Sequence, residues 1–227
     1  MYDEEMAMDV IDMKTYIPGK IICVGMNYRS HVDEQDGRFP ASPILFAKAN
    51  SCVIKDGDDI IYPMEVKQLD YEVELAAVIG KQMKDVDPED VSKYIYGYTV
   101  FNDITARDLQ KSEGQWYRAK SFDTFGPLGP AVIKQGMLGD PGDVNLKSYV
   151  NGELRQDGNT SDMIFGVYDL ISYISRSITL LPGDLVSTGT PSGVGIFSKD
   201  KKLLNPGDVV ACEIEGIGKI TNKVVQL

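Results

Sequence analysis

Apolar residues recur along the chain in many short runs, and turn-forming residues separate these runs. Short alternating or continuous apolar runs are typical of β-strands. By this criterion, strands are predicted over residues 19–25, 43–48, 51–55, 59–62, 70–79 and 95–102. A long succession of short strands favours a fold built mainly from β-sheet.

Two hairpins are predicted in the second half of the chain. Asn151 and Gly152 stand between two extended runs within residues 148–155, and an Asn-Gly pair is a strong signal for a tight hairpin turn. Residues 208–225 alternate apolar and polar positions around two glycines, which predicts a closing hairpin.

Helical periodicity is clearest in residues 161–177, where apolar residues recur at the spacing of one helix face. Shorter helices are predicted at the start of the polar segment 27–39 and over residues 88–94 and 105–111. Residues 117–129 have the composition of a loop. These helices are few and short, so the chain belongs to the α+β class, predominantly β.

No Ser/Gly-rich linker and no shift in composition divides the chain. We therefore expect one domain over residues 20–227, preceded by a short lead-in over residues 1–19. Cys23, Cys52 and Cys212 are far apart and lack metal-binding spacing, so buried, inert thiols are predicted.

The net charge of −11 argues against nucleic acid and anionic membranes as partners, because both require a basic surface. The N-terminus is acidic and no apolar run approaches membrane-spanning length, which favours the cytoplasm. An anionic substrate would have to be attracted by local cations against the overall charge.

Two glutamates lie one residue apart in the apolar run 70–79. In a strand, Glu72 and Glu74 point to one face, and Val73 points to the other. Two adjacent carboxylates in a buried strand repel each other, and a divalent cation between them removes that cost. Asp103 ends another apolar strand and supplies a third oxygen ligand, which favours Mg²⁺, Mn²⁺ or Ca²⁺ over zinc or copper. A solvated strand edge is the alternative.

Other candidate residues lie outside this acidic group. His31 is the only histidine, and Glu34 lies on the same helix face, where a carboxylate can orient the imidazole as a base. Asp33 is a competing partner, and a surface histidine is the alternative. Lys120 has the chemistry to neutralise an oxyanion, unless it is simply solvated. The glycine-rich segment 188–195 exposes N–H groups suited to an anion, or is merely a turn.

These features occur in an order that resembles the fumarylacetoacetate hydrolase family, in its short single-domain branch. The matching stretches are VGMNYRSH at 24–31, DYEVELA at 70–76, NDITARDLQ at 102–110, KSFDT at 120–124 and TGTPSGVG at 188–195. The resemblance runs from about residue 20 to residue 227. It implies a mixed β-roll fold, a catalytic domain over residues 20–227 and a homodimer.

The resemblance also implies roles for particular residues. One Mg²⁺ or Mn²⁺ per chain would be held by Glu72, Glu74 and Asp103. His31 and Glu34 would polarise water, on a segment that closes over the ligand. The remaining implied site residues are catalytic Lys120 and substrate-binding Arg29, Gln110, Gly189 and Thr190.

The implied substrate is a small anionic 2-oxo acid, or 2-hydroxy-dienoic diacid, that reacts through a metal-stabilised enolate. The expected reactions are C–C bond hydrolysis of acylpyruvates and decarboxylation of oxaloacetate. An isomerase of the 2-hydroxyhepta-2,4-diene-1,7-dioate type is the alternative. Hydrolysis requires an activated water, so the His31–Glu34 pair favours it. A non-catalytic metal-binding protein with the same fold is the alternative from another class.

Overall fold

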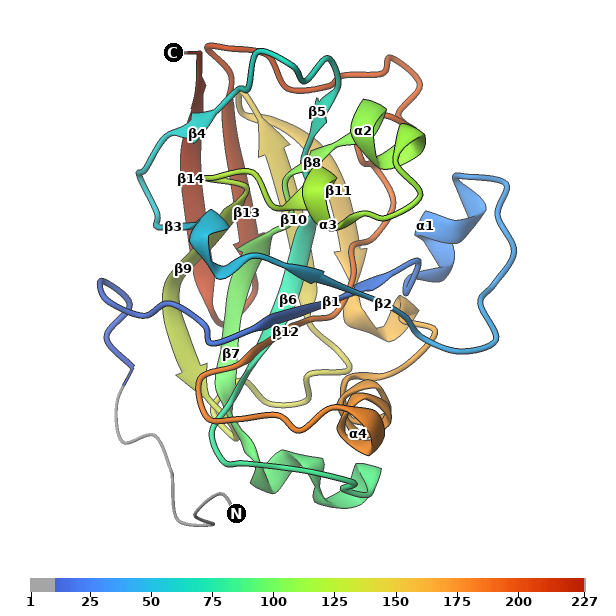
Figure 1. Cartoon of the computed structure of the whole chain (residues 1–227), viewed down its shortest axis with the longest axis vertical. Coiled ribbons are helices and arrows are strands. Elements are labelled where there is room, and N and C mark those ends of the chain that lie inside the picture. The colour runs from blue at the N-terminus through green and yellow to red at the C-terminus, as the bar shows by residue number, and fades with distance from the viewer. Residues whose placement is uncertain (1–10, 227) are drawn as a thin grey trace.

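The computed structural model describes residues 11–226, so part of the lead-in predicted for residues 1–19 lies outside it. Most of the regular structure is β-strand (Figure 1). The strands are β1 (Ile21–Gly25), β2 (Ile44–Lys48), β3 (Val53–Ile54), β4 (Ile60–Ile61), β5 (Leu69–Asp70), β6 (Val73–Ile79), β7 (Ile95–Asn102), β8 (Thr105–Ala106), β9 (Gly126–Lys134), β10 (Asn145–Val150), β11 (Glu153–Asn159), β12 (Leu185–Ser187), β13 (Val209–Ile214) and β14 (Gly218–Val225).

The helices are short and lie around the strands. They are α1 (Arg29–Asp33), α2 (Arg107–Ser112), α3 (Tyr117–Lys120) and α4 (Val167–Ser177), with 3₁₀ turns at Asn50–Cys52, Pro88–Lys93 and Thr160–Asp162. The predicted α+β, predominantly β class and the mixed β-roll are confirmed.

The strands form two main sheets and one small one. The larger sheet has seven strands in the order β2-β1-β12-β6-β7-β9-β3, and the second has five in the order β11-β10-β13-β14-β4. The pair β5-β8 is separate. Pairing is antiparallel except for β1 with β12, β3 with β9 and β4 with β14. Sequence neighbours are often separated in the sheets, so site residues come from distant parts of the chain.

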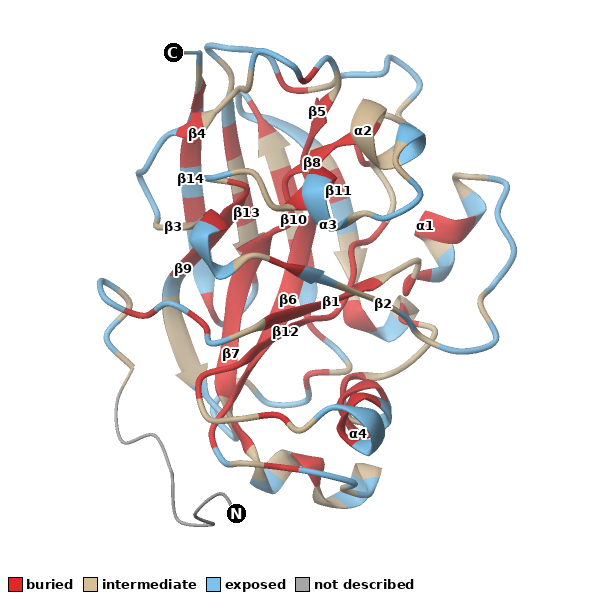
Figure 2. Cartoon of the chain, in the orientation of Figure 1, coloured by how far each residue is buried: buried red, intermediate tan, exposed pale blue. Residues whose placement is uncertain are grey.

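Strand β6 runs through the middle of the larger sheet and is buried along its whole length (Figure 2). Val73 and Leu75 pack into one hydrophobic core, and Ala76 and Val78 pack into a second core on the opposite face. The predicted alternation is therefore confirmed. Truncating Leu75 to alanine would cost about 2–5 kcal/mol of stability, because such a site cannot collapse fully.

Both predicted hairpins are present. Asn151 and Gly152 have positive φ angles of 53° and 80°, as the tight turn between β10 and β11 requires. Strands β13 and β14 pair in register from Val209 with Lys223 to Ile214 with Gly218.

The structure differs from the predicted elements at three places. The run 70–79 is broken, because Asp70 pairs with Thr105 in the small sheet before β6 begins. The helix predicted over 161–177 begins six residues later, at Val167, because Met163 pairs with Tyr28 in an isolated β-bridge.

The third difference is residues 117–129, for which the prediction of a loop was wrong. Helix α3 and the first part of β9 lie there. Gly126 and Pro127 suggested a turn, yet β9 accepts them because it takes part in pairing with both β3 and β7.

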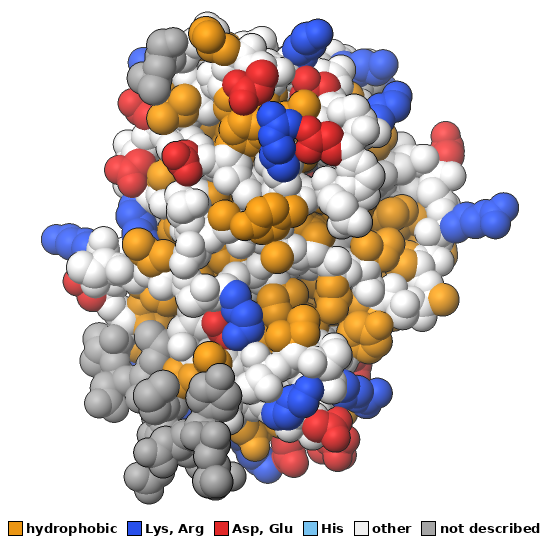
Figure 3. All heavy atoms as spheres, viewed as in Figure 1, with side chains coloured by type: hydrophobic (Ala, Val, Ile, Leu, Met, Phe, Trp, Pro, Cys, Tyr) orange, Lys and Arg blue, Asp and Glu red, His pale blue; other side chains and the backbone are white. Residues whose placement is uncertain are grey.

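Strand β2 forms one edge of the larger sheet. Hydrophobic side chains gather across the middle of the face that β2 crosses, and Ile44 is 37% exposed there (Figure 3). An exposed apolar edge strand is a surface that another chain can cover. The predicted homodimer stays a prediction, and this edge is a candidate surface for it.

Candidate active site

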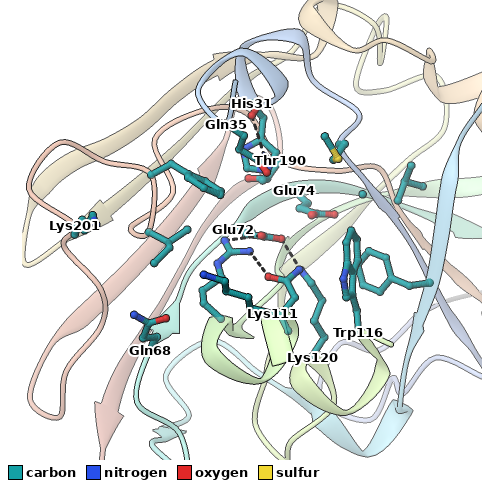
Figure 4. A pocket seen from close by; sticks show the side chains of 18 residues that line it. His31, Gln35, Gln68, Glu72, Glu74, Lys111, Trp116, Lys120, Thr190 and Lys201 are labelled. Carbon is teal, nitrogen blue, oxygen red and sulfur yellow. Dashed lines mark hydrogen bonds and ion pairs between the residues drawn. The ribbon is translucent and has the colours of Figure 1, made fainter. Parts of the chain in front are cut away.

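A cavity of about 560 Å³ opens where the end of β1, helices α1 to α3 and the segment after β12 meet (Figure 4). Its size is typical of small-molecule sites. Glu72 and Glu74 lie in its lining together with His31 and Lys120. The fold thus brings together residues that are far apart in the sequence.

The three predicted metal ligands converge. Oxygen atoms of Glu72, Glu74 and Asp103 lie within 4.8 Å of one another, and all three residues are buried. The antiparallel pairing of β6 with β7 places the start of one strand beside the end of the other, where Asp103 follows. The Asp103 backbone N–H donates to the Glu72 carbonyl at 2.9 Å, which holds the two residues together.

Three buried cations neutralise part of this acidic group. The Lys120 Nζ donates to Glu72 Oε2 at 2.8 Å and to Asp103 Oδ2 at 2.6 Å. The Lys48 Nζ donates to Asp103 Oδ1 at 2.5 Å, and Arg107 pairs with Glu72 Oε1 at 2.7 Å. Lys120 is only 2% exposed, so a solvated lysine is excluded.

Charge compensation fixes the protonation of two of these groups. Burial lowers the pKa of Lys120, but Asp103 and Glu72 outweigh burial and hold the pKa above its usual value. For Glu72, burial raises the pKa, but Lys120 and Arg107 outweigh it and lower the pKa to about 2. Lys120 is therefore a fixed cation, and Glu72 is a fixed carboxylate.

Glu74 lacks such compensation. It accepts hydrogen bonds from Ser187 Oγ at 2.5 Å and from the Gly189 N–H at 3.0 Å, but among the described residues no cationic side chain pairs with it. Burial, with Asp103 and Glu72 nearby, raises the pKa of Glu74 to about 8. A hard divalent cation bound to these all-oxygen ligands would remove this cost, so the site fits Mg²⁺ or Mn²⁺.

The His31–Glu34 pair forms on α1, as its spacing predicted. His31 Nδ1 lies 2.6 Å from Glu34 Oε1, and the Gly193 N–H donates to Glu34 Oε2 at 2.8 Å. Glu34 is thus the carboxylate that pairs with His31, and Asp33 is exposed. The Glu34 carboxylate favours a proton on Nδ1, which leaves Nε2 as the basic nitrogen.

The glycine-rich segment 188–195 binds carboxylates, but they belong to the protein itself. Gly189 and Gly193 donate to Glu74 and Glu34, and Gly195 donates to Asp70 at 2.7 Å. A Cβ on Gly195 would lie 2.6 Å from Asp70 Oδ1, so this close approach requires glycine. The N–H groups that suggested a substrate anion therefore position the acidic side chains of the site.

The structure places the predicted substrate-binding residues differently. Thr190 and Gln110 line the cavity. Thr190 Oγ1 donates to the Val73 carbonyl at 2.8 Å, which anchors it to β6. Arg29 is not brought to the cavity, since its guanidinium donates to the Met163 carbonyl at 2.8 Å. Gly189 also lies outside the lining, because its N–H faces Glu74.

Some site residues were missed from the sequence. Lys48 and Arg107 hold the acidic group, and Asp70 accepts from Arg107 Nε at 2.8 Å. Trp116 packs edge-on against Phe46, with ring centroids 5.3 Å apart, and both line the cavity. Arg107 stands in the 102–110 motif, which was the available signal for it. Lys48 ends an ordinary apolar strand, so nothing in its local sequence marked it.

Features outside the cavity agree with the composition. Cys23, Cys52 and Cys212 are buried and unpaired, as predicted. Their burial raises the pKa of each thiol, which makes them poor nucleophiles. Within residues 11–226, no helix has the length and apolar character needed to cross a membrane. The cytoplasmic location stays a prediction.

The sheets and the buried polar cavity together define a β-roll domain with one composite acid–base site. Residues 20–225 match the family model described as fumarylacetoacetate (FAA) hydrolase C-terminal. The chain belongs to this family.

Named relatives agree with this assignment. The chain is 50% identical over 216 residues to an uncharacterised protein of Methanocaldococcus jannaschii, covering 95% of this chain and 87% of that one. It is 48% identical over 209 residues to oxaloacetate tautomerase Fahd2a, mitochondrial, of Rattus norvegicus, covering 92% and 67%. The crystal structure of 2-hydroxyhepta-2,4-diene-1,7-dioate isomerase from Mycobacterium marinum matches with a TM-score of 0.82 and 42% identity, covering 93% and 76%.

The pKa of Glu74 predicts that metal binding depends on pH. In the metal-free protein, a folded pKa of about 8 against an ordinary value of 4.5 means that stability falls as pH rises between these values. Glu72 acts only below this window, because its pKa is lowered. Below pH about 8, a proton competes with the cation, which weakens apparent Mg²⁺ affinity by about tenfold per pH unit.

We therefore expect Mg²⁺ to raise the melting temperature more near pH 8 than near pH 6. The measurement is a series of thermal melts at fixed ionic strength with increasing Mg²⁺. An equal rise at both pH values would contradict the competition between proton and metal at Glu74.

Proposed function

We propose that this protein is a divalent-metal-dependent enzyme that interconverts the keto and enol forms of 2-oxo dicarboxylates, with oxaloacetate as the reference substrate. The observation that carries this proposal is the pairing, in one cavity, of a fixed cation with a histidine base. Lys120 lies at the acidic group, and His31 lies in the lining of the same cavity. The 48% identity to an oxaloacetate tautomerase supports the same chemistry.

The charge balance of the site suits an anionic substrate. Four buried carboxylates (Asp70, Glu72, Glu74 and Asp103) stand against three buried cations (Lys48, Arg107 and Lys120). One negative charge is left over. A divalent cation held by Glu72, Glu74 and Asp103 would make the site positive and, when bound, would act as a Lewis acid on the 2-oxo group. The sequence alone suggested a more negative site, because Lys48 and Arg107 were not recognised.

The chain's own side chains account for the proton transfer. Glu34 keeps the Nδ1 proton on His31, so Nε2 is free to remove a proton from C3 of the substrate. The electron pair of the broken C–H bond forms the C2–C3 double bond, and negative charge develops on the C2 oxygen. Lys120 stabilises that charge as a fixed cation. The His31 imidazolium then returns a proton to the C2 oxygen, which yields the enol.

Cleavage of an acylpyruvate is the second candidate, and it requires water in place of the C3 proton. The His31–Glu34 pair favours this reaction too, since an oriented imidazole activates water. Product analysis separates the two reactions, because tautomerisation keeps every carbon–carbon bond and hydrolysis does not.

The test is an oxaloacetate assay that follows the loss of enol absorbance, with Mg²⁺, with Mn²⁺ and with EDTA. We expect rapid ketonisation with either metal and only the uncatalysed rate with EDTA. Pyruvate formation and acylpyruvate cleavage are measured in parallel to detect decarboxylation and hydrolysis. Equal rates with metal and with EDTA for all three reactions would contradict the proposal.

A further inference from the structure

The lining of the cavity differs between its two sides. Phe46 and Trp116 form an apolar side next to Lys120, whose Nζ lies 4.9 Å from the Phe46 ring centroid. Gln68, Lys111 and Lys201 lie on the side away from Trp116 (Figure 4). These three residues form the outer polar side, and the proposed mechanism leaves them without a role.

The two lysines of the outer polar side are free to bind an anion. Within residues 11–226, neither Lys111 nor Lys201 has a carboxylate within salt-bridge distance. The inner cations Lys48, Arg107 and Lys120, in contrast, are all paired with acidic residues. In a chain of net charge −11, two unpaired lysines on one side of a cavity attract a carboxylate locally.

The backbone at Lys201 adds a second observation. Its φ angle is 46°, in the left-handed region that glycine adopts at least cost. A lysine there pays a conformational cost, and such residues are often found at functional sites. The segment that carries Lys201 also contributes Ile196 and Phe197 to the lining, and Phe197 lies edge-on to His31 with ring centroids 6.2 Å apart.

The size of the cavity indicates the length of the substrate. Its volume of about 560 Å³ far exceeds what a molecule as small as oxaloacetate fills. If the 2-oxo acid end lies at the acidic group, the outer polar side can meet only a group several carbons away.

We propose that Lys111, Lys201 and Gln68 form a binding subsite for the distal carboxylate of an extended 2-oxo diacid. This inference rests on the proposed function for the position of the 2-oxo end. It makes the preferred substrate a longer diacid than oxaloacetate, with its second carboxylate at the outer polar side.

The test measures binding rather than turnover. Trp116 is the only tryptophan and lines the cavity, so its fluorescence reports occupancy. Dissociation constants are measured with Mg²⁺ for 2-oxoadipate and for its distal methyl ester, which lacks only the second charge. We expect the diacid to bind about tenfold more tightly, as one charge-assisted contact predicts. The ratio should shrink as salt is added.

Variants locate the subsite. Lys111→Ala and Lys201→Ala should bring the ratio of the two dissociation constants close to one. Lys199→Ala is the matched control, because Lys199 is exposed on the same segment but does not line the cavity. Equal affinity for diacid and ester in the unaltered protein would overturn the inference, as would a ratio that survives both lysine variants.

The two proposals fail in different ways. Lack of turnover of oxaloacetate with a clear preference for the diacid would reject the proposed reaction and keep the subsite. Rapid turnover with equal binding of acid and ester would keep the reaction and reject the subsite. If neither ligand bound in the presence of Mg²⁺, the subsite would also be rejected.

Discussion

Replacing Glu74 with glutamine is expected to remove the divalent cation while leaving the metal-free fold intact. The pKa of Glu74 is raised to about 8, so in the absence of metal its side chain is largely neutral near pH 7. A glutamine of the same shape can still accept from Ser187 and Gly189. We expect Mg²⁺ affinity to fall by about 100-fold or more, and turnover to fall by about 10³-fold because Lewis-acid stabilisation is lost.

Glu72→Gln gives the informative contrast. Glu72 is a fixed carboxylate that pairs with both Lys120 and Arg107. Removing its charge should also abolish metal binding and activity, but it leaves two buried cations short of a partner, which costs about 3–5 kcal/mol of stability. Isothermal titration with Mg²⁺ and thermal melts with EDTA measure both properties.

The two variants should therefore separate metal binding from stability. Both lose Mg²⁺, but only Glu72→Gln loses stability in EDTA, and Glu74→Gln also loses the pH dependence of the Mg²⁺ effect. Retained Mg²⁺ affinity in either variant would contradict the ligand assignment. A large loss of stability in metal-free Glu74→Gln would contradict the assignment of Glu74 as the uncompensated carboxylate.

Local patterns in the sequence predicted the parts of this site that depend on local geometry. Alternation in the run 70–79 was enough to place Glu72 and Glu74 on one face, because side-chain direction in a strand depends only on position. Helical spacing was enough to pair His31 with Glu34. The turn at Asn151 followed from its backbone preference alone.

Contacts set by sheet topology were out of reach in the same way that long-range pairing is. Lys48 meets Asp103 across 55 residues, because β1 separates β2 from β12 in a sheet whose order does not follow the chain. Asp70 looked like the first residue of a strand, yet it accepts N–H groups from Gly195 and Ile196. The cations that balance the acidic group therefore appeared only with the fold.

The same topology explains why the glycine-rich segment was misinterpreted. Its N–H groups were recognised as an anion-binding surface, which is correct chemistry. The anions are Glu34, Glu74 and Asp70, which come from three other elements. One segment thus positions the base partner, the uncompensated carboxylate and the partner of Arg107, so its backbone links both halves of the proposed mechanism.

Replacing His31 with alanine should separate proton transfer from metal binding. If Nε2 moves the C3 proton, His31→Ala should slow ketonisation of oxaloacetate by about 10²–10⁴-fold. Glu34→Gln should cause a smaller loss, because the imidazole stays but the Nδ1 proton is no longer held by a charged acceptor. Mg²⁺ affinity should be unchanged in both variants, because neither residue belongs to the acidic group.

Asp33→Asn is the matched control, since Asp33 is an exposed acid on the same helix and should leave every rate unchanged. Decarboxylation of oxaloacetate requires no external base, so any pyruvate formed by the unaltered protein should persist in His31→Ala. Stopped-flow absorbance of the enol and coupled detection of pyruvate measure the two rates on one sample. A parallel loss of both rates would mean that His31 acts by closing the cavity beside Phe197 instead of by moving a proton.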